Sequence, residues 1–337
     1  MIANQSDEQR LRADALLNWI NTQTNLRAEA LDMVSGDASF RRYFRFKFEG
    51  CSYIAVDAPP EKENNHAFFH IAKRYFDAGV QVPEIKAVDL ALGFWVLEDF
   101  GDVLLANRFD SKDVQPLYAQ ALEALRGIQH VMTTDAGTLP AFDDALLDAE
   151  FHLFNHWLIE VHLKLGLTDT QWQTIHEAQE AIRRVFKAQP QVGVHRDYHS
   201  RNLMVLPDDS IGIIDFQDAV TGPVTYDAVS LLRDCYVVWP DAMVDTLISE
   251  WREGHFPQYD AKEFARWFDF VGMQRHIKAS GIFCRLCHRD GKQGYLADIP
   301  RTLEYVVKFG RRYGETRDFA DLVASMVIPA VVSKLAA

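Results

Sequence analysis

The chain has 337 residues, a formal net charge of -13, and a composition of 48% hydrophobic and 25% charged residues. This length allows two lobes with separate cores, and the acidic excess argues against nucleic acid as the main partner. No apolar run is as long as the roughly eighteen residues of a membrane span. The N-terminus is polar and acidic, unlike a signal peptide. We therefore expect a cytoplasmic protein with no membrane partner, no obligate protein partner, and its cysteines as thiols.

The N-terminal third of the chain predicts a small antiparallel sheet with helices packed against it. In the segment 40–48, Phe44 and Phe46 alternate with Arg45 and Lys47, which is the pattern of a half-buried strand. We expect the following elements in chain order: a helix at 7–23, strands at 31–34, 40–48 and 53–56, a helix at 65–78, and strands at 85–88 and 94–97.

The rest of the chain is predicted to be mostly helical. The expected helices span residues 111–132, 143–164, 169–187, 226–236, 241–252, 261–289, 300–312 and 317–334. Together the two patterns predict an α+β fold with the bilobal plan of a protein kinase. Its parts are a β-rich lobe at residues 1–97, a hinge at 98–101, and a helical lobe at 102–337.

A short polar motif interrupts the helical region. Residues 195–202 contain Asp197 and end at Asn202, and Asp215 follows thirteen positions later. In phosphoryl transfer, a carboxylate orients the attacking hydroxyl and takes its proton, a role that suits Asp197. Mg²⁺ prefers hard oxygen ligands, which Asn202 and Asp215 can supply. Apolar flanks around the turn at 207–210 predict a hairpin that carries both metal ligands.

These residues resemble the aminoglycoside phosphotransferase and choline kinase-like superfamily. The distinguishing feature is His199, two positions after Asp197, in the form His-x-Asp-x-His-x-x-x-Asn. Only eleven residues separate Asp215 from Asp227, too few for a peptide-docking activation segment. The resemblance implies a small-molecule acceptor, with His199 in the substrate site. It also implies that Asp227 holds the backbone of the catalytic loop.

A closer resemblance is to the bacterial N-acetylmuramate/N-acetylglucosamine anomeric kinases. It is carried by residues 35–44, 56–60 and 195–218, and most specifically by 274–301, which lies outside the shared catalytic motif. The resemblance implies that ATP, with Mg²⁺, phosphorylates the C1 hydroxyl of an amino sugar in peptidoglycan recycling. Two alternatives stay open: a kinase acting on an aminoglycoside, a choline-like compound or another hydroxylated amine, and a catalytically silent nucleotide-binding scaffold.

The nucleotide is expected between the lobes, against the hinge. The backbone of Glu98 and Phe100 should hydrogen-bond adenine, with Leu97 and Val56 as apolar cover. The turn after the first strand should hold the phosphates through the backbone and side chains of Ser35, Gly36 and Ser39.

The sequence departs from the kinase pattern at the residues that grip phosphate. It has no glycine-rich G-x-G-x-x-G loop, and the position of the usual lysine on the third strand is occupied by Asp57. The helix at 65–78 also lacks the glutamate that would pair with that lysine. We infer that a guanidinium from the second strand replaces the lysine, with Arg42 as the first candidate and Arg41 as the second, because arginine binds phosphate bidentately.

One region of the chain is basic. Between Val271 and Arg312, nine lysines and arginines stand against three acidic residues, an excess of six positive charges. Most such runs are solvated helix faces, but this one could also hold the lactyl carboxylate of N-acetylmuramate. The candidate partners are Arg275, Lys278, Arg285, Arg289 and Lys292.

Overall fold

The computed structural model describes residues 7–35 and 40–336, apart from the side chain of Ser35. The chain divides into two compact units. The first comprises the residues up to Asn107, together with Thr133–Thr138 and Arg201–Asp218, and the second comprises the remainder. The predicted hinge at 98–101 therefore falls inside the first unit, and the chain crosses between units again within the catalytic motif.

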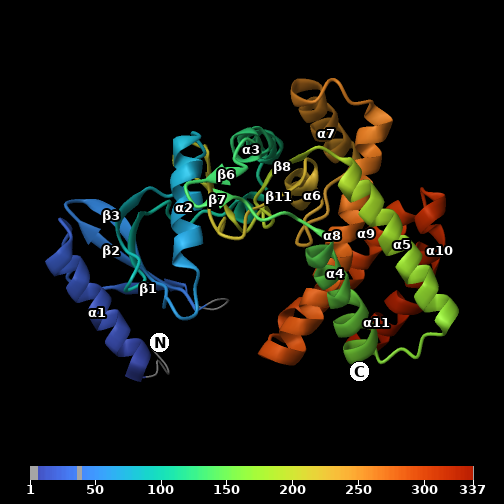
Figure 1. Ribbon diagram of the computed structural model, residues 1–337, viewed down its shortest axis with the longest axis horizontal. Helices are drawn as coiled ribbons and strands as arrows, with labels where there is room; N and C mark the ends of the chain where they lie inside the picture. Colours follow the sequence, from blue (N-terminus) through green and yellow to red (C-terminus); the bar gives the residue numbers. More distant parts are fainter. Residues whose placement is uncertain (1–6, 36–39, 337) are drawn as a thin grey trace. The chain divides into compact units, whose positions relative to one another are not determined.

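The first unit is built on a five-stranded antiparallel sheet, as predicted (Figure 1). The strand order is β1-β2-β3-β5-β4, and neighbours pair in register, for example Arg42 with Asp57. The strands are β1 (Asp32–Ser35), β2 (Arg42–Phe48), β3 (Cys51–Asp57), β4 (Ile85–Asp89) and β5 (Phe94–Glu98). Two helices accompany them, α1 (Asp7–Gln23) and α2 (Asn65–Asp77).

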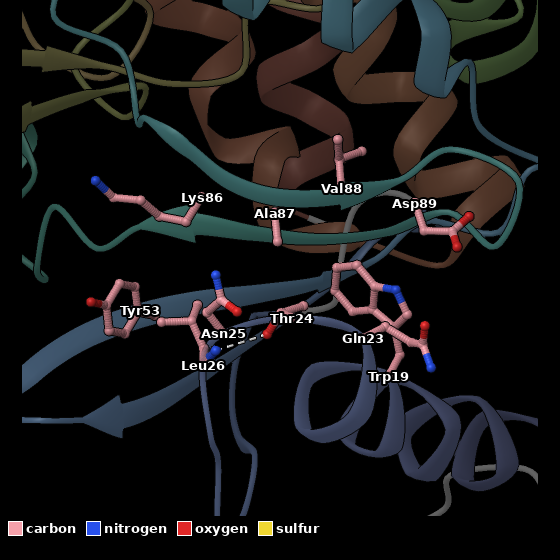
Figure 2. A pocket seen from close by; sticks show the side chains of 10 residues that line it. All are labelled: Trp19, Gln23, Thr24, Asn25, Leu26, Tyr53, Lys86, Ala87, Val88 and Asp89. Atoms are coloured by element: carbon pink, nitrogen blue, oxygen red, sulfur yellow. Dashed lines mark hydrogen bonds between the residues drawn. The ribbon is translucent and has the colours of Figure 1, made fainter.

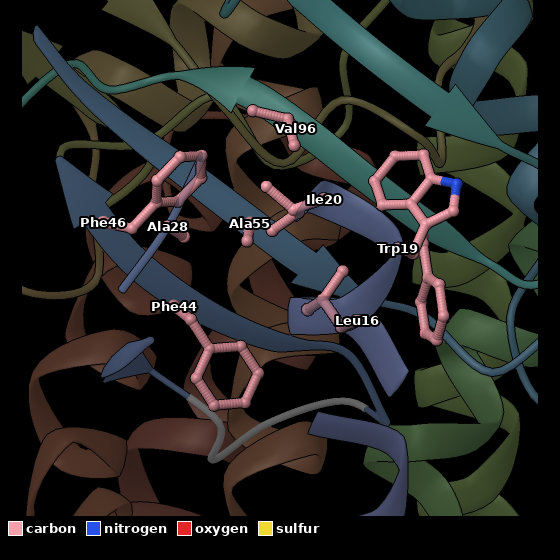
Figure 3. Packing of buried hydrophobic residues seen from close by; sticks show 9 residues of the cluster. Leu16, Trp19, Ile20, Ala28, Phe44, Phe46, Ala55 and Val96 are labelled. Carbon is pink, nitrogen blue, oxygen red and sulfur yellow. The ribbon is translucent and has the colours of Figure 1, made fainter. Parts of the chain in front are cut away.

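The two faces of this sheet are covered by different helices. On one face, Leu16, Trp19 and Ile20 of α1 pack against a cluster that includes Phe44 and Phe46 (Figure 3). On the other face, Phe68 and Phe69 of α2 pack against Val56, Trp95 and Leu97. Since side chains alternate along a strand, each residue of β2 and β3 is assigned to one of these two environments.

The predicted hairpin is present and belongs to the first unit. Strands β9 (Leu203–Val205) and β10 (Ile211–Ile213) pair with each other. The Ile213 N–H donates to the Gln81 carbonyl at 2.8 Å, and the Val205 N–H donates to the Val103 carbonyl at 2.8 Å. A Cβ at Gly212 would lie 2.6 Å from the ring of Phe100, so this close approach requires glycine.

The second unit is mostly helical and is organised around the long helix α8 (Ala261–Asp290). It also contains α3 (Val114–Gln129), α4 (Asp144–His152), the π-helix η2 (Leu153–Leu163), α5 (Asp169–Ala188), α6 (Tyr226–Leu232), α7 (Asp241–His255), the 3₁₀-helix η3 (Gln293–Asp298), α9 (Ile299–Gly310), α10 (Gly314–Leu322), the π-helix η4 (Val323–Val327) and α11 (Ile328–Leu335). None of the helices within the described ranges has the length and apolar character to cross a bilayer.

The helix predicted at 143–164 is correct in extent but changes its geometry midway. It begins as α4 and continues as η2 at the point where α8 crosses it. A Cβ at Gly281 of α8 would lie 2.2 Å from the carbonyl carbon of Leu153. The two backbones therefore meet at a glycine, and the wider turns of η2 begin at that contact. π-Helical turns within a longer helix are frequent near functional sites.

Several short elements were not predicted. The pair β8 (Gln191–Val194) and β11 (Val220–Pro223) flanks the catalytic motif, and β6 (Thr133–Thr134) pairs with β7 (Gly137–Thr138). The 3₁₀-helix η1 (Leu105–Arg108) follows the hinge region. Strands of two to four residues are too short to show a period of two, so the sequence carries little signal for them.

Candidate active site

The catalytic loop in the second unit is held by buried side chains that bind its backbone. Asp227 accepts hydrogen bonds from the N–H groups of His195 and Arg196 at 2.7 and 3.1 Å. Arg275 donates to the Arg196 carbonyl at 2.9 Å. Arg196 itself has a left-handed backbone with φ of 75°, a conformation that costs energy and clusters at functional sites. The expected role of Asp227 is confirmed.

A second buried carboxylate, which sequence reasoning missed, holds the end of the loop. Asp234 accepts from both the backbone N–H and the hydroxyl of Ser200, at 3.1 and 2.5 Å. Its other oxygen accepts from the N–H of Tyr236 at 3.1 Å, and the Tyr236 ring meets His199 edge-on. Asp234 lies two residues beyond the end of α6, so helical spacing from Asp227 gave no signal for it.

Asp197 lies among positive charges. Burial by itself raises the pKa of this carboxyl, but the charges of Lys278, His199 and Arg275 outweigh burial and hold the pKa below its usual value. The Asp197 N–H donates to Nδ1 of the buried His195 at 3.3 Å, which fixes the backbone at that point. The carboxylate of Asp197 is therefore ionised at neutral pH, as a proton acceptor must be.

Lys278 is paired with a buried carboxylate of its own. Its ammonium lies 2.9 Å from Glu150, which also accepts from Arg196 at 3.0 Å and from Gln274 at 2.6 Å. Burial raises the pKa of Glu150, but Lys278 and Arg196 bring it below its usual value. Glu150 thus fixes two cations next to the catalytic loop, and removing Glu150 would leave the buried ammonium of Lys278 uncompensated.

The two predicted metal ligands lie together in the first unit. The amide of Asn202 donates to Asp215 at 3.2 Å, and the Ile214 N–H donates to the Asn202 carbonyl at 3.1 Å. Gln217 donates to the second carboxylate oxygen of Asp215 at 2.9 Å. Asp215 has a left-handed backbone with φ of 64°. A carboxylate and an amide oxygen are a hard donor set that fits Mg²⁺.

Arg42 and Arg41 lie on opposite faces of the sheet. Arg42 lies on the α1 face, where its guanidinium donates to Asp57 at 2.5 and 3.0 Å. Arg12 of α1 donates to the other oxygen of the same carboxylate at 2.5 and 2.8 Å. Asp57 is fully buried. The acid that replaces the usual lysine therefore faces α1, together with Arg42.

Arg41 lies on the α2 face and is paired with an acid that sequence reasoning missed. Its Nε is 3.1 Å from Glu63, just before α2, and its guanidinium lies over the ring of Phe68. The side chain of Arg41 is buried and that of Glu63 is partly buried, at 6% and 13% exposure. Glu63 thus provides the acidic partner of Arg41, because α2 itself contains no glutamate. The signal for this ion pair in the sequence was an acidic residue immediately before the helix rather than within it.

Aromatic stacking connects Arg41 to the metal-ligand turn. Phe68, which lies under the Arg41 guanidinium, stacks on Phe216 with ring centroids 5.0 Å apart, and Phe216 directly follows Asp215. Tyr43 lies nearby. Burial raises the pKa of its hydroxyl, the negative charge of Asp215 adds to the increase, and the Arg41 guanidinium opposes it. Arg41, Tyr43 and Asp215 therefore share one electrostatic environment.

The residues expected to cover adenine lie on the same face as Arg41. Val56 and Leu97 line a narrow cavity together with Arg41 and Phe68. Its volume of about 10 Å³ has room for about one water molecule. The Phe100 N–H has no hydrogen-bond partner in the described part of the chain.

The remaining nucleotide-site predictions concern Glu98 and Ser35, which the structure describes, and two residues outside the described ranges. The backbone of Glu98 was also predicted to contact adenine, and its N–H donates to the Glu84 carbonyl at 2.9 Å. Gly36 and Ser39 lie outside the described residues, and Ser35 ends β1.

A larger pocket of about 650 Å³ lies elsewhere in the first unit, between the end of α1 and strand β4 (Figure 2). Its lining includes Trp19, Asn25, Tyr53 and Lys86. Trp19 belongs to the α1 cluster, so this pocket opens on the sheet face opposite Val56 and Leu97. None of the predicted site residues that the structure describes lines it.

The basic residues predicted to meet the substrate differ in their surroundings. Arg275 and Lys278 are engaged inside the protein, as described above. Arg289 is exposed and donates to Asp290 at 2.7 and 2.9 Å. Arg285 is half-buried near the end of α8, and Lys292 is half-buried just after it. The structure therefore does not gather all five around one point.

Comparison with known proteins shows the class of the chain. A family model described as "Phosphotransferase enzyme family" matches residues 32–268. An N-acetylmuramate/N-acetylglucosamine kinase of Pseudomonas putida is 39% identical over 334 residues, covering 95% of this chain and 98% of the relative. A protein of the same name from Neisseria meningitidis is 38% identical over 320 residues, covering 93% of this chain and 95% of the relative.

Solved structures share the fold at low sequence identity. An ethanolamine kinase of Plasmodium vivax has a TM-score of 0.65 at 15% identity, covering 90% of both chains. The ADP-bound aminoglycoside phosphotransferase APH(2'')-Ib has a TM-score of 0.58 at 13% identity, covering 86% of this chain and 97% of the other. The chain thus belongs to the phosphotransferase enzyme family and has its kinase-like α+β fold.

Proposed function

We propose that this protein transfers the γ-phosphate of ATP to the anomeric C1 hydroxyl of N-acetylmuramate and N-acetylglucosamine. Relatives at 38–39% identity over nearly the whole chain carry the name of a kinase for these two sugars. Such an activity belongs to cytoplasmic peptidoglycan recycling, where a released sugar is returned to phosphorylated form. The observation that carries the proposal is the ionised Asp197 on a tightly held loop.

Asp197 is the proposed proton acceptor. The cations facing it keep its pKa low, so it is a weak base that is fully ionised at neutral pH. An anomeric hydroxyl is more acidic than the other hydroxyls of a sugar, so such a carboxylate suffices to orient it and to accept its proton late in the transfer. Asp227 and Asp234 keep the loop in place through its backbone.

Asn202 and Asp215 are the proposed Mg²⁺ ligands. When bound, Mg²⁺ neutralises charge on the β- and γ-phosphates. No group of three or more His, Cys, Asp or Glu side chains in the described ranges is placed to hold a metal. This agrees with a metal that takes most of its ligands from phosphate and water. Gln217 keeps the Asp215 carboxylate oriented through its hydrogen bond.

Arg41 is the proposed cation for the nucleotide phosphates. It shares the sheet face with Val56 and Leu97, and Phe68 and Phe216 connect it to Asp215 by stacking. Glu63 lies 3.1 Å from Nε of this guanidinium, and the planar fork of arginine matches the geometry of a phosphate group. Arg42, in contrast, is engaged by Asp57 on the far face.

The rival functions are less well supported. A cationic aminoglycoside or choline-like acceptor needs acidic partners near the base, whereas Asp197 faces Lys278, Arg275 and His199. A silent scaffold has no use for an ionised base, two metal ligands and three side chains that hold the loop. The chemistry of the site therefore favours an active kinase with a neutral or anionic acceptor.

The test is a panel of acceptors incubated with ATP and Mg²⁺, with products identified by phosphorus NMR. We expect an anomeric phosphate from N-acetylmuramate and N-acetylglucosamine, and no product from kanamycin. Asp197→Asn is the matched control and should lose about 10²–10⁴-fold in turnover, the usual worth of a positioned base. A product phosphorylated at C6 would overturn the anomeric assignment.

A further inference from the structure

Tyr236 is an aromatic residue beside the catalytic loop that the sequence did not assign to the site. Its ring lies edge-on to the imidazole of His199, with ring centroids 5.8 Å apart. His199 in turn is near the proposed base, because its positive charge helps to lower the pKa of Asp197. All three residues belong to the second unit and are half-buried. Tyr236 therefore lies one side chain away from the proposed base and remains partly accessible.

The backbone of Tyr236 is fixed to the catalytic loop by a buried carboxylate. One oxygen of Asp234 accepts from the Tyr236 N–H at 3.1 Å, and the other accepts from the N–H and the hydroxyl of Ser200. Arg301 of α9 also holds this segment, since its guanidinium donates to the Cys235 carbonyl at 2.6 Å. Asp234 is buried, so breaking its bonds would leave a buried polar group without partners. The ring of Tyr236 therefore keeps its place relative to the catalytic loop.

The other end of the segment 236–239 is anchored by aromatic packing. Trp239 lies edge-on to Phe109 and to Tyr118 of α3, with ring centroids 5.5 and 5.2 Å away. A segment held at both ends is ordered before a ligand binds, so binding does not have to supply the cost of ordering it. An edge-on contact with His199 occupies at most one face of the Tyr236 ring. Tyr236 is thus a fixed aromatic surface beside the catalytic loop.

We infer that Tyr236 binds the acceptor by stacking on its sugar ring, while Asp197 engages the hydroxyl that is phosphorylated. A pyranose in its chair form presents several C–H groups on one face, and the electron-rich face of an aromatic ring attracts such weakly positive hydrogens. Small-molecule sites commonly combine aromatic walls with a few precisely placed polar groups. N-acetylmuramate and N-acetylglucosamine share the same ring, so Tyr236 contributes to the binding of both. This assignment rests on the proposed function, because it presupposes that these sugars are the acceptors.

The experiment replaces the ring and measures kcat and KM separately for both sugars and for ATP. Tyr236→Leu removes the aromatic surface but keeps an apolar side chain. We expect KM for both sugars to rise roughly three- to tenfold, with kcat and KM for ATP little changed, because only acceptor binding is weakened. Tyr236→Phe keeps the ring and should recover most of this loss. Val238→Ala is the matched control, because Val238 is an exposed residue of the same segment, and it should change none of these values.

A purely structural role for Tyr236 gives a different result. If the ring only supports the catalytic loop, Tyr236→Leu should lower kcat and leave KM for the sugars unchanged, which would refute the assignment while the proposed function stands. Tyr236→Phe as weak as Tyr236→Leu would also refute it, because the hydroxyl rather than the ring face would then make the contact. Tyr236→Met is a second aliphatic replacement in case Tyr236→Leu does not fold, since methionine adapts to irregular space, and the same rise in KM is expected. A wild type that phosphorylates neither sugar would overturn the proposed function itself, and the assignment with it.

Discussion

Arg42 and Asp57 face each other across strands β2 and β3, with two guanidinium nitrogens 2.5 and 3.0 Å from one carboxylate oxygen. Arg12 of α1 completes the group from the other side. An aspartate at the position of the usual phosphate-binding lysine would repel a nucleotide if it faced one. Its two arginines instead make it part of the contact between α1 and the sheet.

Arg41→Gln and Arg42→Gln should therefore have different effects. Arg41→Gln should weaken ATP more than ADP, because the proposed contact includes the γ-phosphate. Arg42→Gln should leave nucleotide binding intact but lower the free energy of unfolding by about 3 kcal/mol, since Asp57 keeps only Arg12. Calorimetry with both nucleotides and thermal unfolding measure the two effects. Selective loss of ATP affinity in Arg42→Gln alone would reverse the assignment.

Asp215→Ala should abolish the contribution of Mg²⁺ to ATP affinity, because it removes the charged oxygen ligand that Asn202 accompanies. The measurement is ATP binding with and without Mg²⁺. Asp208→Asn is a suitable control, since Asp208 lies in the turn of the same hairpin and bonds only Ser210. Equal Mg²⁺ dependence in Asp215→Ala and the wild type would remove Asp215 from the metal site.

The pH dependence of turnover should respond in opposite directions to two substitutions around Lys278. Lys278→Met removes the cation that most lowers the pKa of Asp197. The acidic limb of kcat/KM should then move to higher pH. Glu150→Gln leaves Lys278 without its counter-charge, so the pKa of Asp197 should fall and the limb should move to lower pH. Shifts of the same sign would show that the limb reports another group.

His276 should make folding sensitive to acid. Burial lowers the pKa of this imidazole to about 3, whereas an unfolded histidine titrates near about 6.5. Between these values the unfolded chain binds a proton that the folded protein does not. The contribution of His276 to the free energy of unfolding is therefore fully present above about pH 6.5. It declines as the pH falls towards 3, by an amount on the order of 4 kcal/mol.

His276→Phe tests this linkage. The aromatic ring keeps the stacking on Tyr305, whose ring centroid is 4.4 Å away, but removes the titrating nitrogens. Denaturant unfolding between pH 7 and 4 should show a flatter dependence on pH than in the wild type. An unchanged slope would mean that other buried groups account for the acid sensitivity.

The amino-acid sequence by itself determined the sheet and the hairpin, and it suggested the proposed catalytic residues. The elements of the sheet follow from local periodicity, and Asp197, Asn202 and Asp215 are proposed from a spacing that suits phosphoryl transfer. The role of Asp227 came from the resemblance to the phosphotransferase superfamily. These features depend on residues near one another along the chain, so a linear reading reaches them.

Only the tertiary structure decided how the charges are partnered. Alternation along β2 places Arg41 and Arg42 on opposite faces, but α1 and α2 determine what each face contacts, through Arg12 and Phe68. The partners Glu63 and Glu150 depend on segments distant in sequence. The role of a charged side chain is set by the charges within a few ångströms of it, and those neighbours are known only once the chain has folded.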